Sequence, residues 1–378
     1  MGFIRIIGYF FFFCTFLLES SNGQNLAPSN FPPSNLAPSS FAPSNIAPSS
    51  FAPSNSLFSA VLVFGGSSVD TGNNNYIPYA SFKSDYLPYG LDYDYETPTG
   101  RFSNGKVIPD FVSSRLGLKD RIPPFLDPKL PDEELSSGVN FASAGAGFDD
   151  LTLSTRNAIC ITSQVALFKR YIERLKIVVG GDNANLILNN SLVMATTGSF
   201  DNVNVYLVGP KKSLDAMFNY KDHSLITNIK QFIKQMYGLG CPTILVTGLP
   251  PFGCLPLPNK EISAECTDEQ NKDSLYYNDQ LIEMLPKLQD QLPGSKLIYV
   301  DVYKPIVDMI NFPAKYGFVE TRSPCCTTTL LMCQKDAPIC QNTSEYLYWD
   351  RTHLTEAGNR HLMQIIEKDI LPKILTKN

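Results

Sequence analysis

The sequence predicts an α/β domain built on a mostly parallel, five-stranded sheet with helices on both faces. Short runs rich in β-branched residues alternate with longer stretches whose apolar residues recur every three or four positions. Consecutive runs are far enough apart for a crossover helix, which parallel strands require. The chain has 378 residues, 43% of them hydrophobic and 18% charged, so it can bury a full core.

Each predicted strand ends in Gly, Ser, Asp or another loop-forming residue, which indicates that polar loops leave the strands on one side of the sheet. In such folds ligands bind outside the carboxyl ends of the strands. The predicted strands cover 60–65, 138–143, 191–198, 243–250 and 296–303. The predicted helices cover 107–118, 163–179, 224–240, 276–292 and 354–375.

The start of the chain differs in composition from this domain, which we assign to residues 57–378. Residues 1–23 have one early arginine, an apolar run over 6–18 and small polar residues, the pattern of a cleaved signal peptide. The run is shorter than the roughly 20 apolar residues of a membrane span. We therefore expect a secreted, extracellular protein without a transmembrane segment; an uncleaved N-terminal anchor is the alternative.

Residues 24–56 form a spacer dominated by a pentapeptide that recurs six times over 25–54 and ends each time in Pro-Ser. Proline in every repeat excludes helices and sheet ladders and favours an extended, disordered chain. An inert linker is the favoured interpretation, and contact with a cell wall or surface is the alternative. The formal charge of the whole chain is −5, which gives no basis for nucleic-acid binding.

Export would leave eight cysteines in an oxidising compartment, where an even number suggests disulfides. Cys254 and Cys266 are close enough in sequence for a local bridge. The four cysteines of 325–340 lack both histidine and paired C-x₂-C spacings, so bridges are favoured over a metal site, and no metal or other cofactor is expected. Asn189 and Asn342 head N-x-S/T sequons, typical of surface glycosylation.

Three residues carry the predicted chemistry. Ser67 follows the first strand directly in a glycine-rich turn, where a hydroxyl can face a crevice. Asp350 precedes His353 by three residues, just before Thr355, which suits the N-cap of the last helix. At that spacing the carboxylate can accept the Nδ1 proton and leave Nε2 free to take a proton from a serine. The other two histidines have no carboxylate in a comparable arrangement.

Five segments in this order resemble the successive blocks of plant GDSL-type esterase/lipases, of the SGNH hydrolase superfamily. They are FGGSSVDTGNNN, GRFSNGKVIPDF, GVNFASAGAGF, TGLPPFGCLP and YLYWDRTHLTEAG, spread over 64–358. The resemblance implies a flavodoxin-like, three-layer fold and hydrolysis of carboxylic esters, often acyl lipids, without a metal. It also implies Ser67 as nucleophile, Asp350 and His353 as its partners, and an oxyanion N–H from Ala144 or Gly145 beside that of Ser67.

Two blocks depart from the family pattern. The family writes Gly-Asp-Ser-Leu where this chain has 65–68 as Gly-Gly-Ser-Ser. Where the family places an oxyanion-binding asparagine, this chain has Phe200, which cannot donate a hydrogen bond. Losing one such donor typically slows turnover by about 10²- to 10³-fold. We therefore expect a slow secreted esterase or lipase; a catalytically impaired protein that binds lipids or surfaces is the alternative.

Overall fold

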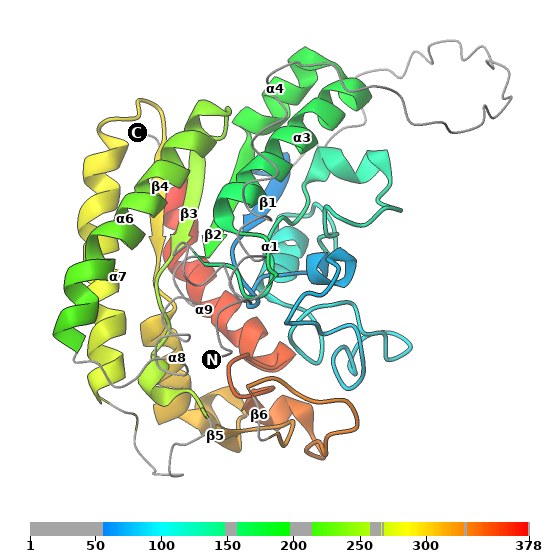
Figure 1. The fold of residues 1–378 in the computed structure, drawn as a ribbon, viewed down its shortest axis with the longest axis vertical. Helices are drawn as coiled ribbons and strands as arrows, with labels where there is room; N and C mark the ends of the chain where they lie inside the picture. Colours follow the sequence, from blue (N-terminus) through cyan, green and yellow to red (C-terminus); the bar gives the residue numbers. More distant parts are fainter. Residues whose placement is uncertain are drawn as a thin grey trace, which may run out of the picture.

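The computed structural model describes residues 56–147, 157–196, 214–257, 266, 268–328 and 331–376. The signal-peptide and spacer predictions, apart from Ser56, lie outside these residues. A parallel sheet forms the centre of the domain (Figure 1). Its strands are β1 (Ala60–Phe64), β2 (Ser191–Thr196), β3 (Thr243–Thr247) and β4 (Lys296–Val300), paired in that order.

The predicted strand at 138–143 lies beside β1 but is not a regular strand. One parallel bridge joins Asn140 to Val63, and the Phe141 N–H donates to the Val63 carbonyl at 2.8 Å. The ladder is interrupted at Gly65, whose N–H donates to Gln164 Oε1 at 2.9 Å instead of to this segment. With this segment included, the spatial order is the flavodoxin-like one, second-first-third-fourth-fifth. The predicted α/β fold class is confirmed.

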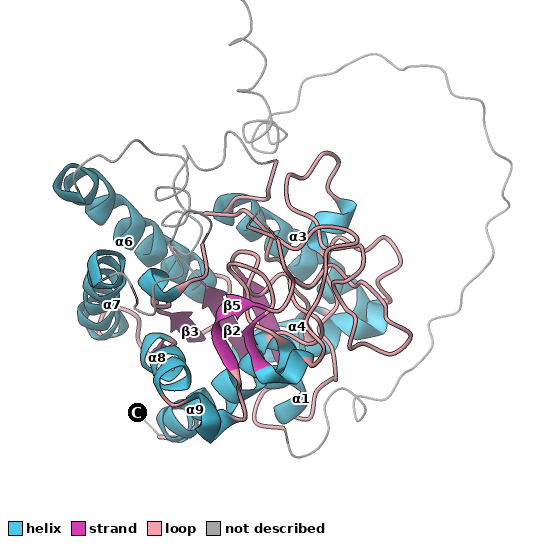
Figure 2. Cartoon of the chain, turned by 90° about the horizontal axis from the view of Figure 1, so that it is seen from below, coloured by secondary structure: helices cyan, strands magenta, loops and turns pink. Residues whose placement is uncertain are grey.

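Helices cover both faces of the sheet. Figure 2 shows α3 and α6 on one face and α1, α8 and α9 on the other, while α7 packs beside β4. The helices are α1 (Ile108–Arg115), α3 (Ile161–Val179), α4 (Gly181–Asn189), α6 (Leu214–Gly238), α7 (Asp268–Gln289), α8 (Tyr303–Asn311) and α9 (Glu356–Leu375). All five predicted helices are present, whereas α4 and α8 were not predicted.

A second, two-stranded sheet pairs β5 (Glu320–Pro324) with β6 (Tyr346–Tyr348) in parallel, and the sequence interpretation did not anticipate it. Disulfides staple the chain after β5, where Cys325 joins Cys340 and Cys326 joins Cys333. The predicted bridge between Cys254 and Cys266 is also present. The prediction that the cysteines of 325–340 form bridges is therefore confirmed.

The even number of cysteines suggested disulfides, but two of the eight cysteines do not take part in one among the described residues. Cys160 and Cys241 are buried and form no disulfide among the described residues. Cys241 is fully buried just before β3, and this burial raises the pKa of its thiol to about 11. It therefore behaves as a small apolar side chain of the core.

Candidate active site

Ser67 lies in the turn that leaves the carboxyl end of β1, and two contacts fix that turn. Gly65 has φ of +143°, and a Cβ atom there would lie 2.6 Å from the Thr196 carbonyl oxygen on β2, so glycine is required. On the other side, Gln164 of α3 accepts from the Gly65 N–H and donates to the Gly65 carbonyl, both at 2.9 Å. The half-buried Ser67 is thus held at the edge of the sheet.

The residues expected to act together are brought together from opposite ends of the domain. Ser67 Oγ lies 2.8 Å from His353 Nε2. His353 Nδ1 lies 2.8 Å from both carboxylate oxygens of Asp350. A carboxylate at Nδ1 places the ring proton there, so Nε2 accepts the hydrogen bond from the serine hydroxyl. The three side chains have the geometry of a Ser-His-Asp triad.

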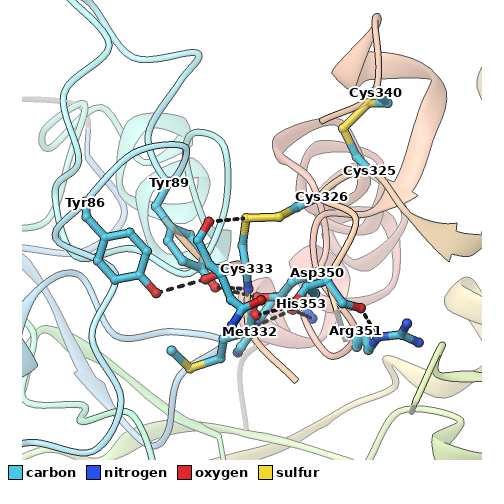
Figure 3. Close-up of a disulfide and its surroundings, with 12 residues drawn as sticks. Tyr86, Tyr89, Cys325, Cys326, Met332, Cys333, Cys340, Asp350, Arg351 and His353 are labelled. Atoms are coloured by element: carbon cyan, nitrogen blue, oxygen red, sulfur yellow. Dashed lines mark hydrogen bonds and ion pairs between the residues drawn. A yellow bond between two sulfur atoms is a disulfide. The ribbon is translucent and has the colours of Figure 1, made fainter. Parts of the chain in front are cut away.

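The Asp350 carboxylate is fully buried and saturated with donors. Besides the imidazole, its Oδ1 accepts from the backbone N–H groups of Thr352 and His353, both at 2.9 Å. Its Oδ2 accepts from the Tyr89 hydroxyl at 2.8 Å, and Figure 3 shows Tyr89 directed at this carboxylate. A buried carboxylate with this many donors is held in one orientation.

The segment that carries His353 is anchored by the start of α9 and by an aromatic ring. Thr355 is the N-cap of α9, as predicted, and its hydroxyl oxygen accepts from the Gly358 N–H at 3.0 Å. Phe102 packs against the His353 imidazole with ring centroids 5.1 Å apart. Ser103 Oγ donates to the Leu354 carbonyl at 3.1 Å. The 100–111 segment therefore shields and positions the imidazole.

Neither the Ser67 N–H nor the Gly145 N–H has an acceptor among the described residues. The Ala144 N–H, in contrast, donates to the Asp70 carboxylate at 2.9 Å. Of the two predicted oxyanion candidates, Ala144 is thus engaged elsewhere, and Gly145, which lines the pocket, remains available. Phe200, expected at the third oxyanion position, lies outside the described residues.

Asp70 organises the loop below this donor pair. Its Oδ1 accepts from the Gly72 and Asn73 N–H groups, both at 2.8 Å. Complete burial raises the pKa of Asp70 from 3.8 to about 6, although three backbone N–H groups and the charge of Arg101 oppose that rise. The carboxyl therefore titrates near neutral pH while it holds the backbone on which the Gly145 N–H is presented.

A pocket of about 420 Å³ opens beside Ser67 and His353, within the usual range for small-molecule sites. It is a long slot between the sheet and α9. One stripe of α9 lines it for about 18 Å, at a rise of about 1.5 Å per residue. The apolar members of this stripe are Leu362, Met363, Ile366, Ile370, Leu371 and Ile374.

The alternation of side chains along the strands explains why the slot lies on the α9 side of the sheet. Leu192 and Met194 of β2 and Leu245 of β3 point toward α9 and line the slot. Their neighbours Val193 and Ile244 point the other way and are completely buried. The face toward α3 and α6 is closely packed, whereas the face toward α9 leaves room for an apolar ligand.

The comparisons with known proteins agree with this geometry. The family model described as GDSL-like Lipase/Acylhydrolase matches residues 61–366. The chain belongs to this family. A GDSL esterase/lipase of Arabidopsis thaliana is 43% identical over 324 residues, covering 83% of this chain and 90% of the relative. Two further Arabidopsis GDSL esterase/lipases are 42% identical with the same coverage, and 44% identical with 80% and 88% coverage.

Family membership makes the protein a carboxylic ester hydrolase and suggests lipid esters as its substrates. Within the described residues, none of the helices combines the length and apolar character that crossing a bilayer takes. The two predicted glycosylation positions, Asn189 at the end of α4 and Asn342 before β6, are both exposed.

Two residues of this esterase site escaped the sequence interpretation. Gln164 lies within a predicted helix, and a single helical glutamine gives no sign that it holds a turn nearly one hundred residues away. Tyr89 lies 261 residues before the carboxylate that it contacts. Neither has a local pattern that could have identified it, because each acts through a contact made only in the folded chain.

Proposed function

We propose that this chain is a secreted esterase or lipase that hydrolyses acyl lipid esters through Ser67, His353 and Asp350. The observation that carries the proposal is the 2.8 Å contact between Ser67 Oγ and His353 Nε2, with Asp350 on the opposite ring nitrogen. Because a serine hydroxyl is a weak nucleophile, it needs an adjacent base in this position.

In the proposed first step, Ser67 Oγ attacks the ester carbonyl carbon while His353 Nε2 takes the hydroxyl proton. The carbonyl π electrons move onto oxygen, and the N–H groups of Ser67 and Gly145 stabilise that oxyanion. Collapse of the tetrahedral intermediate breaks the bond to the alcohol oxygen, which leaves with the proton from His353. A water molecule then attacks the acyl-enzyme, gives its proton to His353 and releases the acid, and the proton returns to Ser67.

The apolar slot along α9 supports a long-chain acyl group as the part of the substrate next to the reacting carbonyl. Each methylene buried in it contributes about 0.8 kcal/mol, or about fourfold in kcat/KM, as an upper bound. We expect kcat/KM to rise from p-nitrophenyl acetate through the octanoate until the slot is filled. A constant or falling kcat/KM over this series would exclude the slot as the acyl site.

The decisive experiment compares Ser67→Ala with Ser68→Ala on these esters. Replacing the nucleophile lowers turnover by about 10⁶-fold. The Ser68 hydroxyl is exposed and bonds to none of the described residues, so Ser68→Ala keeps most of the activity. Equal activities in the two variants would contradict the proposed nucleophile, and a wild-type chain that binds the esters without turnover would favour the lipid-binding alternative.

Secretion, glycosylation at Asn189 and Asn342, and reduced turnover caused by Phe200 belong to the same proposal. The two exposed sequons are accessible to a glycosyltransferase, which supports passage through the secretory route. Expression in a eukaryotic host, followed by mass spectrometry of the medium, tests both points. The chain should appear there without residues 1–23 and with glycans on both asparagines.

A further inference from the structure

The Asp350 carboxylate receives a hydrogen bond that the proposed mechanism does not use. Tyr89 is completely buried, and its hydroxyl donates to Asp350 Oδ2 at 2.8 Å. The same hydroxyl oxygen accepts from the Cys333 N–H at 2.9 Å. A phenol has a single proton to donate, so this geometry commits the proton to the carboxylate and the lone pair to the backbone.

Cys333 is itself held from three directions. Its N–H is bonded to Tyr89, and its carbonyl accepts from the Tyr86 hydroxyl at 2.8 Å. Its sulfur forms the disulfide with Cys326. Figure 3 shows the two tyrosines on the same side of this cysteine. A shift of the Cys333 backbone would therefore strain the disulfide or break one of these two hydrogen bonds.

These contacts close into a ring around the carboxylate. Starting at Asp350, the chain steps back to Trp349, whose carbonyl accepts from the Cys326 N–H at 2.8 Å. The disulfide leads from Cys326 to Cys333, and the Tyr89 hydroxyl leads back to Asp350. A closed ring of this kind restricts the carboxylate more than any one of its bonds would.

We propose that Tyr89 is a positioning residue for ester hydrolysis, and that the disulfide between Cys326 and Cys333 anchors it. Tyr89 holds Asp350 in the orientation that directs the imidazole of His353 at Ser67. This inference rests on the function proposed above, since it assigns no new chemistry to Tyr89 itself. It predicts that a change behind the carboxylate alters the reaction at the serine.

The charges around the ring are consistent with a donating phenol. Burial, followed by the negative charge of Asp350, raises the pKa of Tyr89 well above 10, so the hydroxyl keeps its proton at any working pH. Burial together with the charges of Asp350 and Asp85 also raises the pKa of Tyr86. The guanidinium of Arg351, the residue after Asp350, donates to backbone carbonyls, with Nε on the Thr328 carbonyl at 2.7 Å and a terminal nitrogen on the Pro256 carbonyl at 2.8 Å.

The two tyrosines offer a matched pair of variants. Tyr89→Phe removes the bond to the carboxylate and the acceptor for Cys333. Tyr86→Phe removes one phenol hydroxyl from the same loop, and within the described part of the chain that hydroxyl bonds only to the Cys333 carbonyl. A purely structural role would give the two variants similar behaviour, whereas a positioning role for Tyr89 separates them.

Steady-state turnover of a p-nitrophenyl ester by the purified full chain, measured from pH 5 to 9, provides the test. Tyr89→Phe should lower kcat about tenfold, with KM within about twofold of wild type, because a hydrogen bond to a charged group is lost. The acidic limb of its pH–rate profile should move to higher pH, because a carboxylate that has lost the hydrogen bond from Tyr89 holds the imidazole proton more tightly. Tyr86→Phe should keep the wild-type profile.

The disulfides supply a second matched pair. Replacing Cys326 and Cys333 together by alanine should lower kcat and move the acidic limb in the same direction as Tyr89→Phe. Replacing Cys325 and Cys340 removes a neighbouring bridge outside the ring and should lower only the unfolding midpoint. Unfolding curves of all four variants establish that each is folded under the assay conditions.

A readout that needs no turnover separates this inference from the proposed function. In the Ser67→Ala chain, the low-field proton resonance of the His353 Nδ1–H should shift when Tyr89→Phe is added and stay in place when Tyr86→Phe is added. Wild-type kcat and acidic limb in Tyr89→Phe, or an unmoved resonance, would overturn the positioning role. A Ser67→Ala chain that still turns over ester would instead overturn the proposed function.

Discussion

Gln164 provides the most direct test of how the turn that carries Ser67 is built. The side chain is completely buried and bonds to both backbone groups of Gly65, two residues before Ser67. Its amide also donates to the Ile159 carbonyl at 3.0 Å. Gln164→Leu keeps most of the volume and removes all three hydrogen bonds.

The expected loss of stability in Gln164→Leu depends on which hydrogen bonds the backbone groups of Gly65 keep. The Gly65 carbonyl keeps the Ser143 N–H, at 3.0 Å, so it stays satisfied. The Gly65 N–H, in contrast, loses its acceptor, and leaving one buried donor unpaired costs about 1–3 kcal/mol. We expect the free energy of unfolding to fall by about 2 kcal/mol, within that range. We also expect turnover to fall about tenfold or more, since 1.4 kcal/mol of lost alignment has that effect.

Urea unfolding, followed by the fluorescence of Trp349, the single tryptophan, measures the first quantity, and turnover of a saturating p-nitrophenyl ester measures the second. Gln289→Leu is the matched control. Gln289 Oε1 accepts from the Leu297 N–H at 2.7 Å on β4, which lies at the other end of the four-stranded sheet from β1. This variant should therefore lose stability without losing turnover. If Gln164→Leu matches wild type in both measurements, Gln164 does not hold the turn.

Three further predictions concern the same region. Gly65→Ala should destabilise the fold by more than about 1 kcal/mol, because the new Cβ would meet the Thr196 carbonyl oxygen. Gly66→Ala should stabilise the fold by about 0.4–1 kcal/mol, since Gly66 has no positive φ and has room for a methyl group. A higher unfolding midpoint for Gly65→Ala than for Gly66→Ala would contradict this prediction. The raised pKa of Asp70 means that its proton is bound more tightly in the folded chain, so its contribution, up to about 3 kcal/mol, is present below pH 3.8 and is lost as the pH rises through about 6. The free energy of unfolding should fall between pH 4.5 and pH 7.5 by more in wild type than in Asp70→Asn. An equal change in the two proteins would refute this prediction. Phe200→Asn should raise kcat by up to about 10²-fold on short esters, and unchanged turnover would show that no oxyanion donor is missing.

Local sequence patterns were enough for the elements with strong periodicity. Strands β1, β2, β3 and β4 begin within one residue of the predicted positions, because each is a buried apolar run after a loop. The runs end earlier than predicted. Thr247 and Val300, for example, are the last paired residues of β3 and β4, and the loops that follow these strands line the pocket.

The missed elements have different causes. Helix α8 is amphipathic, but it begins at Tyr303, which is the last residue of the predicted strand over 296–303, so the strand prediction concealed its start. Strands β5 and β6 are short, β5 is also polar, and their pairing joins segments more than twenty residues apart. Such pairings are decided by tertiary context rather than by propensity.

The sequence by itself predicted strands β1 to β4, five of the helices and the candidates Ser67, Asp350 and His353, because these follow from local periodicity and recognisable motifs. It also suggested the local disulfide between Cys254 and Cys266. Only the tertiary structure decided that Tyr89 contacts Asp350, that Gln164 contacts Gly65, and that a long apolar slot lies along α9. These features arise from contacts between residues far apart in the chain, whose geometry is set by how the layers pack.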